Sequence, residues 1–119
     1  FFGEMQRVER GLAAWRAGNL AELGRLVSES GRSSIENYQC GAEPLVALYH
    51  LLSETEGVYG ARFSGAGFRG CCVALIDPAA AETVAQRVLS AYWQRFPDLA
   101  DHAWATLCRS AGGASLQGW

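Results

Sequence analysis

The sequence predicts one α+β domain, in which an antiparallel sheet is covered by helices on one face. The chain has 119 residues, which is room for a single hydrophobic core, so we expect one domain over residues 1–119. Half of the residues are hydrophobic and 18% are charged, which excludes a disordered chain and a collagen-like repeat. Along the chain, helical periodicity gives way to short strand patterns beside glycine-rich turns.

Two helices are predicted at the start of the chain. Apolar residues from Phe1 to Trp15 recur at helical spacing, and Gly18 ends this first helix. Asn19, followed by Glu22, resembles a capping box that starts the second helix. The second helix continues into a polar stretch over residues 28–38. That stretch is either a solvated helix end or the wall of a binding site, and its candidate residues are Ser33, Ser34, Asn37 and Tyr38.

The rest of the chain is predicted to alternate strands and helices. A third, well-buried helix begins near Glu43 and Pro44, with proline in the tolerated first turn. Residues 58–64 are typical of a strand, and the continuously apolar residues 71–76 predict a fully buried one. Asp77 and Pro78 begin a fourth helix that Pro97 ends. Alternation over residues 104–109 and a Gly-Gly turn predict a terminal hairpin, with its last strand around residues 114–117.

Composition excludes several kinds of function. The net charge of −2 and the lack of a basic run argue against nucleic-acid binding, and no apolar run is long enough to span a membrane. All ten basic residues are arginines, so a P-loop lysine, a Schiff-base lysine and a lysine general base are excluded within this chain. The four cysteines lack metal-ligand spacing, so we expect no metal site and reduced thiols in a cytoplasmic protein. The chain begins without methionine on a helical pattern, and we expect it to be a piece of a longer protein.

Five glycines cluster between Gly57 and Gly70, and this segment is the candidate site. Such glycines let backbone amides approach an oxyanion or phosphate without an intervening Cβ. The alternative is a tight hairpin whose glycines serve turn geometry alone. Next to the loop, Arg62 lies in the first predicted strand, where we expect it to pair with a helix carboxylate rather than to contact a ligand.

The string over residues 57–71, Gly-Val-Tyr-Gly-Ala-Arg-Phe-Ser-Gly-Ala-Gly-Phe-Arg-Gly-Cys, resembles the third, C-terminal motif of the GHMP small-molecule kinases in its sugar-kinase form. Other landmarks agree in order, among them Glu29-Ser30, Glu43-Pro44-Leu45 and Cys108-Arg109, so that the similarity covers most of residues 5–116. Within the superfamily the chain is similar to galactokinases, and more so to galacturonokinases. It departs from galactokinases at Gly31, at Asn37 and in the loop Gly-Ala-Gly-Phe-Arg-Gly, where they have Gly-Gly-Gly-Phe-Gly-Gly.

The resemblance implies a ferredoxin-like C-terminal domain that faces an N-terminal domain across an active-site cleft. ATP, Mg²⁺ and the catalytic aspartate would belong to that N-terminal domain, so that this chain holds no catalytic residue and binds no cofactor by itself. The sugar or sugar acid would lie against a loop formed by Ser64, Gly65, Ala66, Gly67, Phe68, Arg69 and Gly70. Arg69 replaces a glycine that galactokinases usually have, and its guanidinium suits the C6 carboxylate of a uronic acid. The alternative for Arg69 is a surface side chain that pairs with Glu56 or faces solvent.

The resemblance leaves three alternatives to a galacturonokinase-like sugar-1-kinase. The first is a galactokinase or another sugar kinase of the superfamily, and the second is a non-catalytic sugar-sensing regulator of the same fold. A plain ferredoxin-like ligand-binding module is the third. If the domain is separated from its N-terminal partner, its exposed apolar residues, Phe1, Phe2 and Trp15, could support a homodimer of the fragment.

Overall fold

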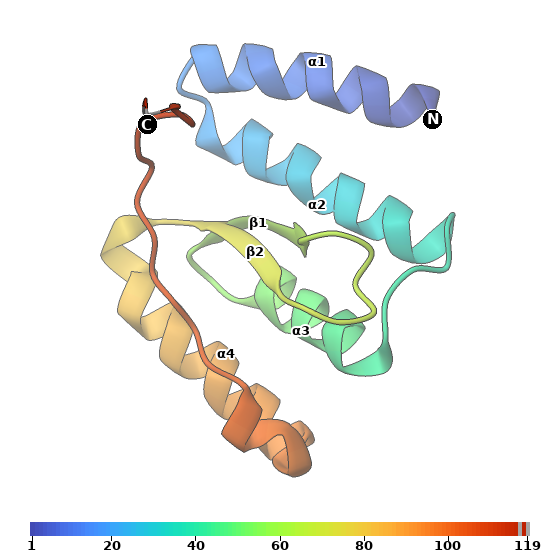
Figure 1. Cartoon of the computed structure of the whole chain (residues 1–119), viewed down its shortest axis with the longest axis vertical. Helices are drawn as coiled ribbons and strands as arrows, with labels where there is room; N and C mark the ends of the chain where they lie inside the picture. The colour runs from blue at the N-terminus through green and yellow to red at the C-terminus, as the bar shows by residue number, and fades with distance from the viewer. Residues whose placement is uncertain (117, 119) are drawn as a thin grey trace.

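The structure, a computed structural model, describes residues 1–116 and Gly118 and has the predicted order of helices and strands around the glycine loop (Figure 1). Three helices precede an antiparallel strand pair, and a fourth helix follows it, so the α+β class is confirmed. The elements are α1 (Phe2–Arg16), α2 (Leu20–Glu36), α3 (Glu43–Glu54), β1 (Val58–Phe63), β2 (Cys72–Ile76), η1 (Pro78–Ala80), α4 (Ala81–Arg95) and η2 (Pro97–His102). No helix of the described residues has the length and apolar character needed to cross a membrane.

Local sequence signals set where the helices begin. The side chain of Asn19 accepts a hydrogen bond from the backbone N–H of Glu22 at 3.1 Å, which caps α2 as predicted. Pro44 lies in the first turn of α3, where a missing N–H costs nothing. Asp77 accepts from the N–H of Ala79 at 2.9 Å and so caps the short η1 turn that leads into α4.

The core lies between the sheet and α3. β1 and β2 pair in an antiparallel register that sets Ala61 opposite Ala74 and Phe63 opposite Cys72. Ala61 and Phe63 are buried with Leu45 and Tyr49 of α3 in one cluster. α4 then packs against α3 through a face that buries Val84, Val88 and Tyr92. This cluster anchors β1 immediately before the glycine loop.

α2 packs against β1 so closely that glycine is required on both elements. A Cβ on Gly24 would overlap the backbone of Tyr59, and a Cβ on Gly60 would overlap the carbonyl oxygen of Gly24. A few residues further along, the hydroxyl of Ser28 accepts a hydrogen bond from the backbone N–H of Ala61 at 3.1 Å. The helix therefore supplies β1 with a hydrogen-bond acceptor that a neighbouring strand would otherwise provide.

Two predictions about strands are wrong. β2 is only partly buried, with Val73 49% exposed, because it belongs to a two-stranded sheet that α3 covers on one side. The terminal hairpin is absent from residues 103–116, which contain no strand; Gln117, where the last strand was predicted to end, lies outside the described residues. The segment instead runs along α4 (Figure 1), and the indole N–H of Trp93 donates to the carbonyl of Ala103 at 3.1 Å. The segment thus lies beside a helix rather than in a sheet, and its residues 104–116 stay exposed.

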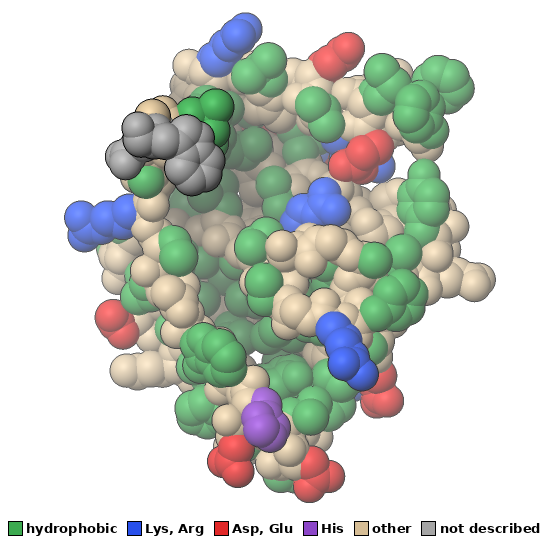
Figure 2. All heavy atoms as spheres, viewed as in Figure 1, with side chains coloured by type: hydrophobic (Ala, Val, Ile, Leu, Met, Phe, Trp, Pro, Cys, Tyr) green, Lys and Arg blue, Asp and Glu red, His purple; other side chains and the backbone are tan. Residues whose placement is uncertain are grey.

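Hydrophobic side chains are also exposed along α1, as Figure 2 shows at the top of the view. The helix buries Ala14, while the apolar residues that recur on one face at helical spacing remain 50% or more exposed. They are Phe2, Met5, Val8, Leu12 and Trp15. The periodicity therefore identified the helix correctly, and Phe1, Phe2 and Trp15, the residues expected to be exposed on a separated domain, are exposed.

Candidate functional site

The candidate site is the loop over residues 64–70, which joins β1 to β2. The loop is closed at its base by a hydrogen bond from the N–H of Ser64 to the carbonyl of Cys71, at 2.9 Å. Gly65, Gly67 and Gly70 all have positive φ, at 90°, 76° and 105°. Side chains rarely adopt this conformation, so the three glycines are required by the path of the backbone.

Phe63 forms the floor of the loop. Its side chain is 1% exposed, and its ring lies directly under Gly67, where a Cβ would overlap it. The same ring lies against Gly41, where a Cβ would come within 2.7 Å of it. The carbonyl of Gly67 accepts a hydrogen bond from the N–H of Ala42 at 2.8 Å, which ties the loop to the turn before α3. One aromatic ring and one hydrogen bond thus fix the middle of the loop.

The rest of the loop is open to solvent. Gly67 is buried, whereas the remaining predicted loop residues are exposed. They are Ser64, Gly65, Ala66, Phe68, Arg69 and Gly70. Cβ atoms added at Gly65 and Gly70 would meet nothing within 4 Å, so these glycines leave space around the backbone. The loop therefore combines a fixed centre with an accessible surface that includes the guanidinium of Arg69.

The predicted cleft-wall residues lie at the C-terminal end of α2, and their hydrogen bonds are mostly local. The amide of Asn37 donates to the hydroxyl of Ser33 at 2.9 Å, and Ser34 donates to the carbonyl of Ser30 at 3.1 Å. Tyr38 is 62% exposed. The loop itself is tied to Ala42, a few residues beyond this stretch. Asn37 and Ser34 thus bond groups of the same helix, which is how a solvated helix end is also built, whereas the Tyr38 hydroxyl accepts from the backbone amine of Phe1 at 3.3 Å.

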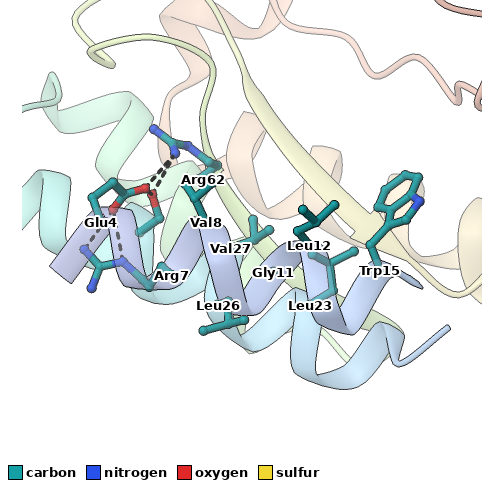
Figure 3. Close-up of a pocket in the computed structure, with 11 residues that line it drawn as sticks. Glu4, Arg7, Val8, Gly11, Leu12, Trp15, Leu23, Leu26, Val27 and Arg62 are labelled. Atoms are coloured by element: carbon teal, nitrogen blue, oxygen red, sulfur yellow. Dashed lines mark hydrogen bonds and ion pairs between the residues drawn. The ribbon is translucent and has the colours of Figure 1, made fainter. Parts of the chain in front are cut away.

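Arg62 pairs with a helix carboxylate, as predicted, through a network that joins three elements. Its Nη1 donates to the hydroxyl of Ser30 in α2 at 2.7 Å and lies 3.8 Å from the carboxylate of Glu4 in α1. Ser30 in turn donates to Glu4 at 2.7 Å, and Arg7 donates to the same carboxylate at 2.8 Å. Figure 3 shows Glu4 between the two guanidinium groups, at one end of a groove of about 300 Å³ between α1 and α2.

The network keeps the Glu4 carboxyl ionised. Partial burial by itself would raise the pKa of Glu4. The hydrogen bonds from Ser30 and Arg7 and the positive charges of Arg7 and Arg62 outweigh that effect, so the pKa lies below its ordinary value. Sequence reasoning did not single out Glu4 or Phe63, and it included Ser30 only within the polar stretch over residues 28–38. The signal of Ser30 was a polar residue within the amphipathic pattern of α2, and the structure shows that it is only 5% exposed.

The described residues hold no obvious metal centre. Within residues 1–116 and Gly118, no group of three or more His, Cys, Asp and Glu side chains is placed to hold a metal ion. All four cysteines are free thiols. What the site offers a ligand is therefore a glycine-rich backbone, one exposed guanidinium and one exposed phenylalanine.

The helix order and the glycine loop are those expected of the C-terminal domain of the GHMP small-molecule kinases. The model of the family described as GHMP kinases C terminal matches residues 11–95, and the chain belongs to this family. The similarity predicted from residues 57–71 is thereby confirmed.

Among curated proteins, the chain is 55% identical over 102 residues to a galacturonokinase of Arabidopsis thaliana, a match that covers 86% of this chain and 24% of that protein. It is 35% identical over 116 residues to a galactokinase of Bos taurus, with 96% and 27% covered. The crystal structure of Lactococcus lactis galactokinase complexed with galactose is similar in fold, with a TM-score of 0.72 and 30% sequence identity over 77% of this chain and 24% of that one. The chain thus spans about a quarter of the length of the relatives it matches.

Proposed function

We propose that this chain is the C-terminal domain of an ATP-dependent sugar-1-kinase that acts on a uronic acid, as a galacturonokinase does. The whole enzyme would transfer the γ-phosphoryl group of ATP to the anomeric hydroxyl of the sugar. The observation that carries the proposal is the loop over residues 64–70, held at Gly67 and exposed around it. The 55% identity to a protein named galacturonokinase favours the uronic acid over galactose.

The proposed task of the loop is to position the reactants. Phosphoryl transfer depends mainly on positioning and on electrostatic stabilisation of the transferring group, and it needs little covalent chemistry from the protein. A loop of glycines can place backbone N–H groups close to negatively charged oxygens, and its fixed centre avoids the cost of reorganisation. ATP and Mg²⁺ would be held mainly by an N-terminal domain, which is also the proposed partner of this chain.

Arg69 is the proposed specificity residue. Its side chain lies in the exposed part of the loop, where it can reach a ligand. A guanidinium can form two parallel hydrogen bonds to the C6 carboxylate of a uronic acid, and galactose lacks that carboxylate. Such charge-assisted hydrogen bonds contribute roughly 1.5–3 kcal/mol each, which corresponds to a tenfold or larger preference.

The test is a kinase assay on the full-length protein, with ATP, Mg²⁺, galacturonate and galactose. We expect phosphorylation of galacturonate at C1, and we expect Arg69→Gly to lower kcat/KM for galacturonate about tenfold or more while changing galactose use little. Arg87→Gln, which removes an exposed guanidinium from α4, is the matched control and leaves both activities unchanged. Equal loss on both sugars contradicts the role of Arg69.

The same assay separates the alternatives. Activity on galactose alone identifies a galactokinase, and binding of a sugar without turnover identifies a non-catalytic regulator of the same fold. The isolated chain of residues 1–119 is expected to turn over no ATP with any sugar. We also propose a cytoplasmic location, which the four free thiols support, because reduced cysteines are typical of that compartment.

A further inference from the structure

The polar network of Glu4, Ser30 and Arg62 lies directly behind the glycine loop. Arg62 is the penultimate residue of β1, and the loop begins two residues later at Ser64. Besides donating to Ser30, Arg62 donates through its Nε to the backbone carbonyl of Phe63 at 3.1 Å. The Arg62 side chain is thus bonded to the backbone of Phe63, and the ring of Phe63 forms the floor of the loop.

Three separate contacts determine where Arg62 itself lies. The hydroxyl of Ser30 accepts a hydrogen bond from Nη1 of Arg62 and donates one to the carboxylate of Glu4. Gly31, the next residue of α2, lies so close to the strand that a Cβ there would come within 3.0 Å of the carbonyl of Ala61 and 3.2 Å of the Cα of Arg62. The strand and the helix are therefore in contact at the backbone of Arg62. The half-buried guanidinium itself is held by Ser30 and by the Phe63 carbonyl.

Phe63 packs directly against the loop, so a change in the position of Phe63 changes the position of the loop. The ring touches Gly67 and Gly41, and the carbonyl of Gly67 is bonded to Ala42. A shift of the Phe63 backbone would move the ring, and the ring cannot move without displacing Gly67, because there is no free space between them. The contacts form a continuous path from Glu4 to the middle of the loop.

We propose that Arg62, held by Glu4 and Ser30, is a positioning residue that sets the geometry of the loop over residues 64–70 without touching the substrate. The kinetic part of this inference rests on the proposed function, since it assumes that the loop contacts the sugar or the transferring phosphoryl group. The structural part, that the network controls the order of the loop, does not depend on any activity.

A second ion-pair network in the same two helices provides a matched control. Glu22 of α2 accepts hydrogen bonds from Arg10 of α1 at 2.9 Å and from Arg25 at 2.8 Å, so it too links α1 to α2. The hydrogen bonds and ion pairs of this network involve no residue of β1. Glu22→Gln therefore removes a charge and a link between helices, as Glu4→Gln does, but leaves the path to Phe63 intact.

The experiment measures hydrogen exchange of the backbone amides over residues 64–71 in the full-length protein, together with kcat and KM. The variants are Arg62→Lys, Arg62→Met and Glu4→Gln, with Glu22→Gln as the control. We expect exchange in the loop to become about tenfold faster in Arg62→Met and Arg62→Lys, because neither side chain can hold the Phe63 carbonyl as Nε does. Glu4→Gln gives a smaller increase, since Ser30 still binds Arg62, and Glu22→Gln gives none.

The kinetic readout distinguishes positioning from a general loss of stability. Misplacement of the loop lowers kcat about tenfold or more while KM for ATP is unchanged, and Arg62→Lys does not rescue kcat. Unchanged loop exchange in both Arg62 variants, or an equal effect of Glu22→Gln, overturns the inference. If the unsubstituted protein phosphorylates no sugar, the proposed function fails, and the exchange rates alone then decide whether Arg62 positions the loop.

Discussion

Gly24 of α2 and Gly60 of β1 are in backbone contact, and neither position has room for a Cβ atom. Helices and strands usually pack through side chains, so a contact of this kind brings the backbones unusually close together. It places α2 where Ser28 can reach Ala61 and Ser30 can reach Arg62. The position of Arg62 and Ser30 therefore depends on two glycines that take no part in their hydrogen bonds.

The first prediction concerns this contact. Gly60→Ala and Gly24→Ala should each lower the free energy of unfolding by about 3 kcal/mol, because the backbones must separate to accept the methyl group. Gly11→Ala in α1 is the control, since its Cβ would make an ordinary 3.7 Å contact with Leu23 of α2. That substitution should stabilise the chain by about 0.5–1 kcal/mol through its higher helix propensity. Urea unfolding followed by circular dichroism measures all three, and equal effects at Gly11 and Gly60 contradict the contact.

The second prediction separates backbone strain from steric overlap in the loop. Gly65→Ala places a side chain at φ 90° in open space, so it should cost about 1–2 kcal/mol. Gly67→Ala adds an overlap with the Phe63 ring to a similar strain at φ 76°, so it should cost about 3 kcal/mol or more. Urea denaturation of the two variants compares them directly. A larger loss for Gly65→Ala would show that Phe63 does not support the loop.

The third prediction concerns acid unfolding. The hydrogen bond from Arg25 lowers the pKa of Glu22 to about 2, with desolvation opposing it and Arg10 adding to it. A carboxyl whose pKa is depressed on folding stabilises the protein fully above its ordinary pKa of 4.5, and this stabilisation is lost as the pH falls toward 2. The free energy of unfolding should therefore decrease between pH 4.5 and pH 2. In Glu22→Gln this decrease should be smaller, as urea titrations at a series of pH values can measure; an unchanged slope contradicts the depressed pKa.

The fourth prediction contrasts two adjacent thiols. Burial raises the pKa of Cys72 to about 12, and the neighbouring Cys71 adds to the effect, whereas Cys71 itself is exposed. Because the thiolate is the reactive form, iodoacetamide at pH 8 should alkylate Cys71 at least about a hundredfold faster than Cys72. Mass spectrometry of the peptide that carries both residues, in a Cys71→Ser and a Cys72→Ser variant, gives the two rates. In urea the rates should become equal, and a fast Cys72 in the folded chain would contradict its burial.

The helix starts and the loop could be predicted because their signals are local. Asn19, Pro44 and Asp77 act on backbone groups within a few residues of themselves, so each can be recognised in the sequence without the fold. The glycines of the loop are equally local, since positive φ is a property of the residue itself. The resemblance to the third motif of the family rests on a local string as well, residues 57–71.

The long-range contacts could not be predicted from these signals. The sequence indicated that Arg62 meets a helix carboxylate, but several glutamates on the first two helices satisfy that description, and the fold selects Glu4. Residues 104–109 alternate as a strand does, yet alternation does not say whether a sheet edge is available, and the segment lies beside α4 instead. Likewise, the apolar spacing of α1 predicts a helix without saying which of its residues are buried, and the fold buries Ala14.

The way in which α1 is attached has a consequence for the whole molecule. Besides burying Ala14, the helix is linked to the rest of the chain by Glu4, which meets Ser30 of α2 and Arg62 of β1, and by Arg10, which pairs with Glu22 of α2. Interactions between partly exposed charges weaken as salt is added, whereas the packing of Phe63 does not. The attachment of α1 to α2 and β1 should therefore weaken as the ionic strength rises, while the core around Phe63 stays packed.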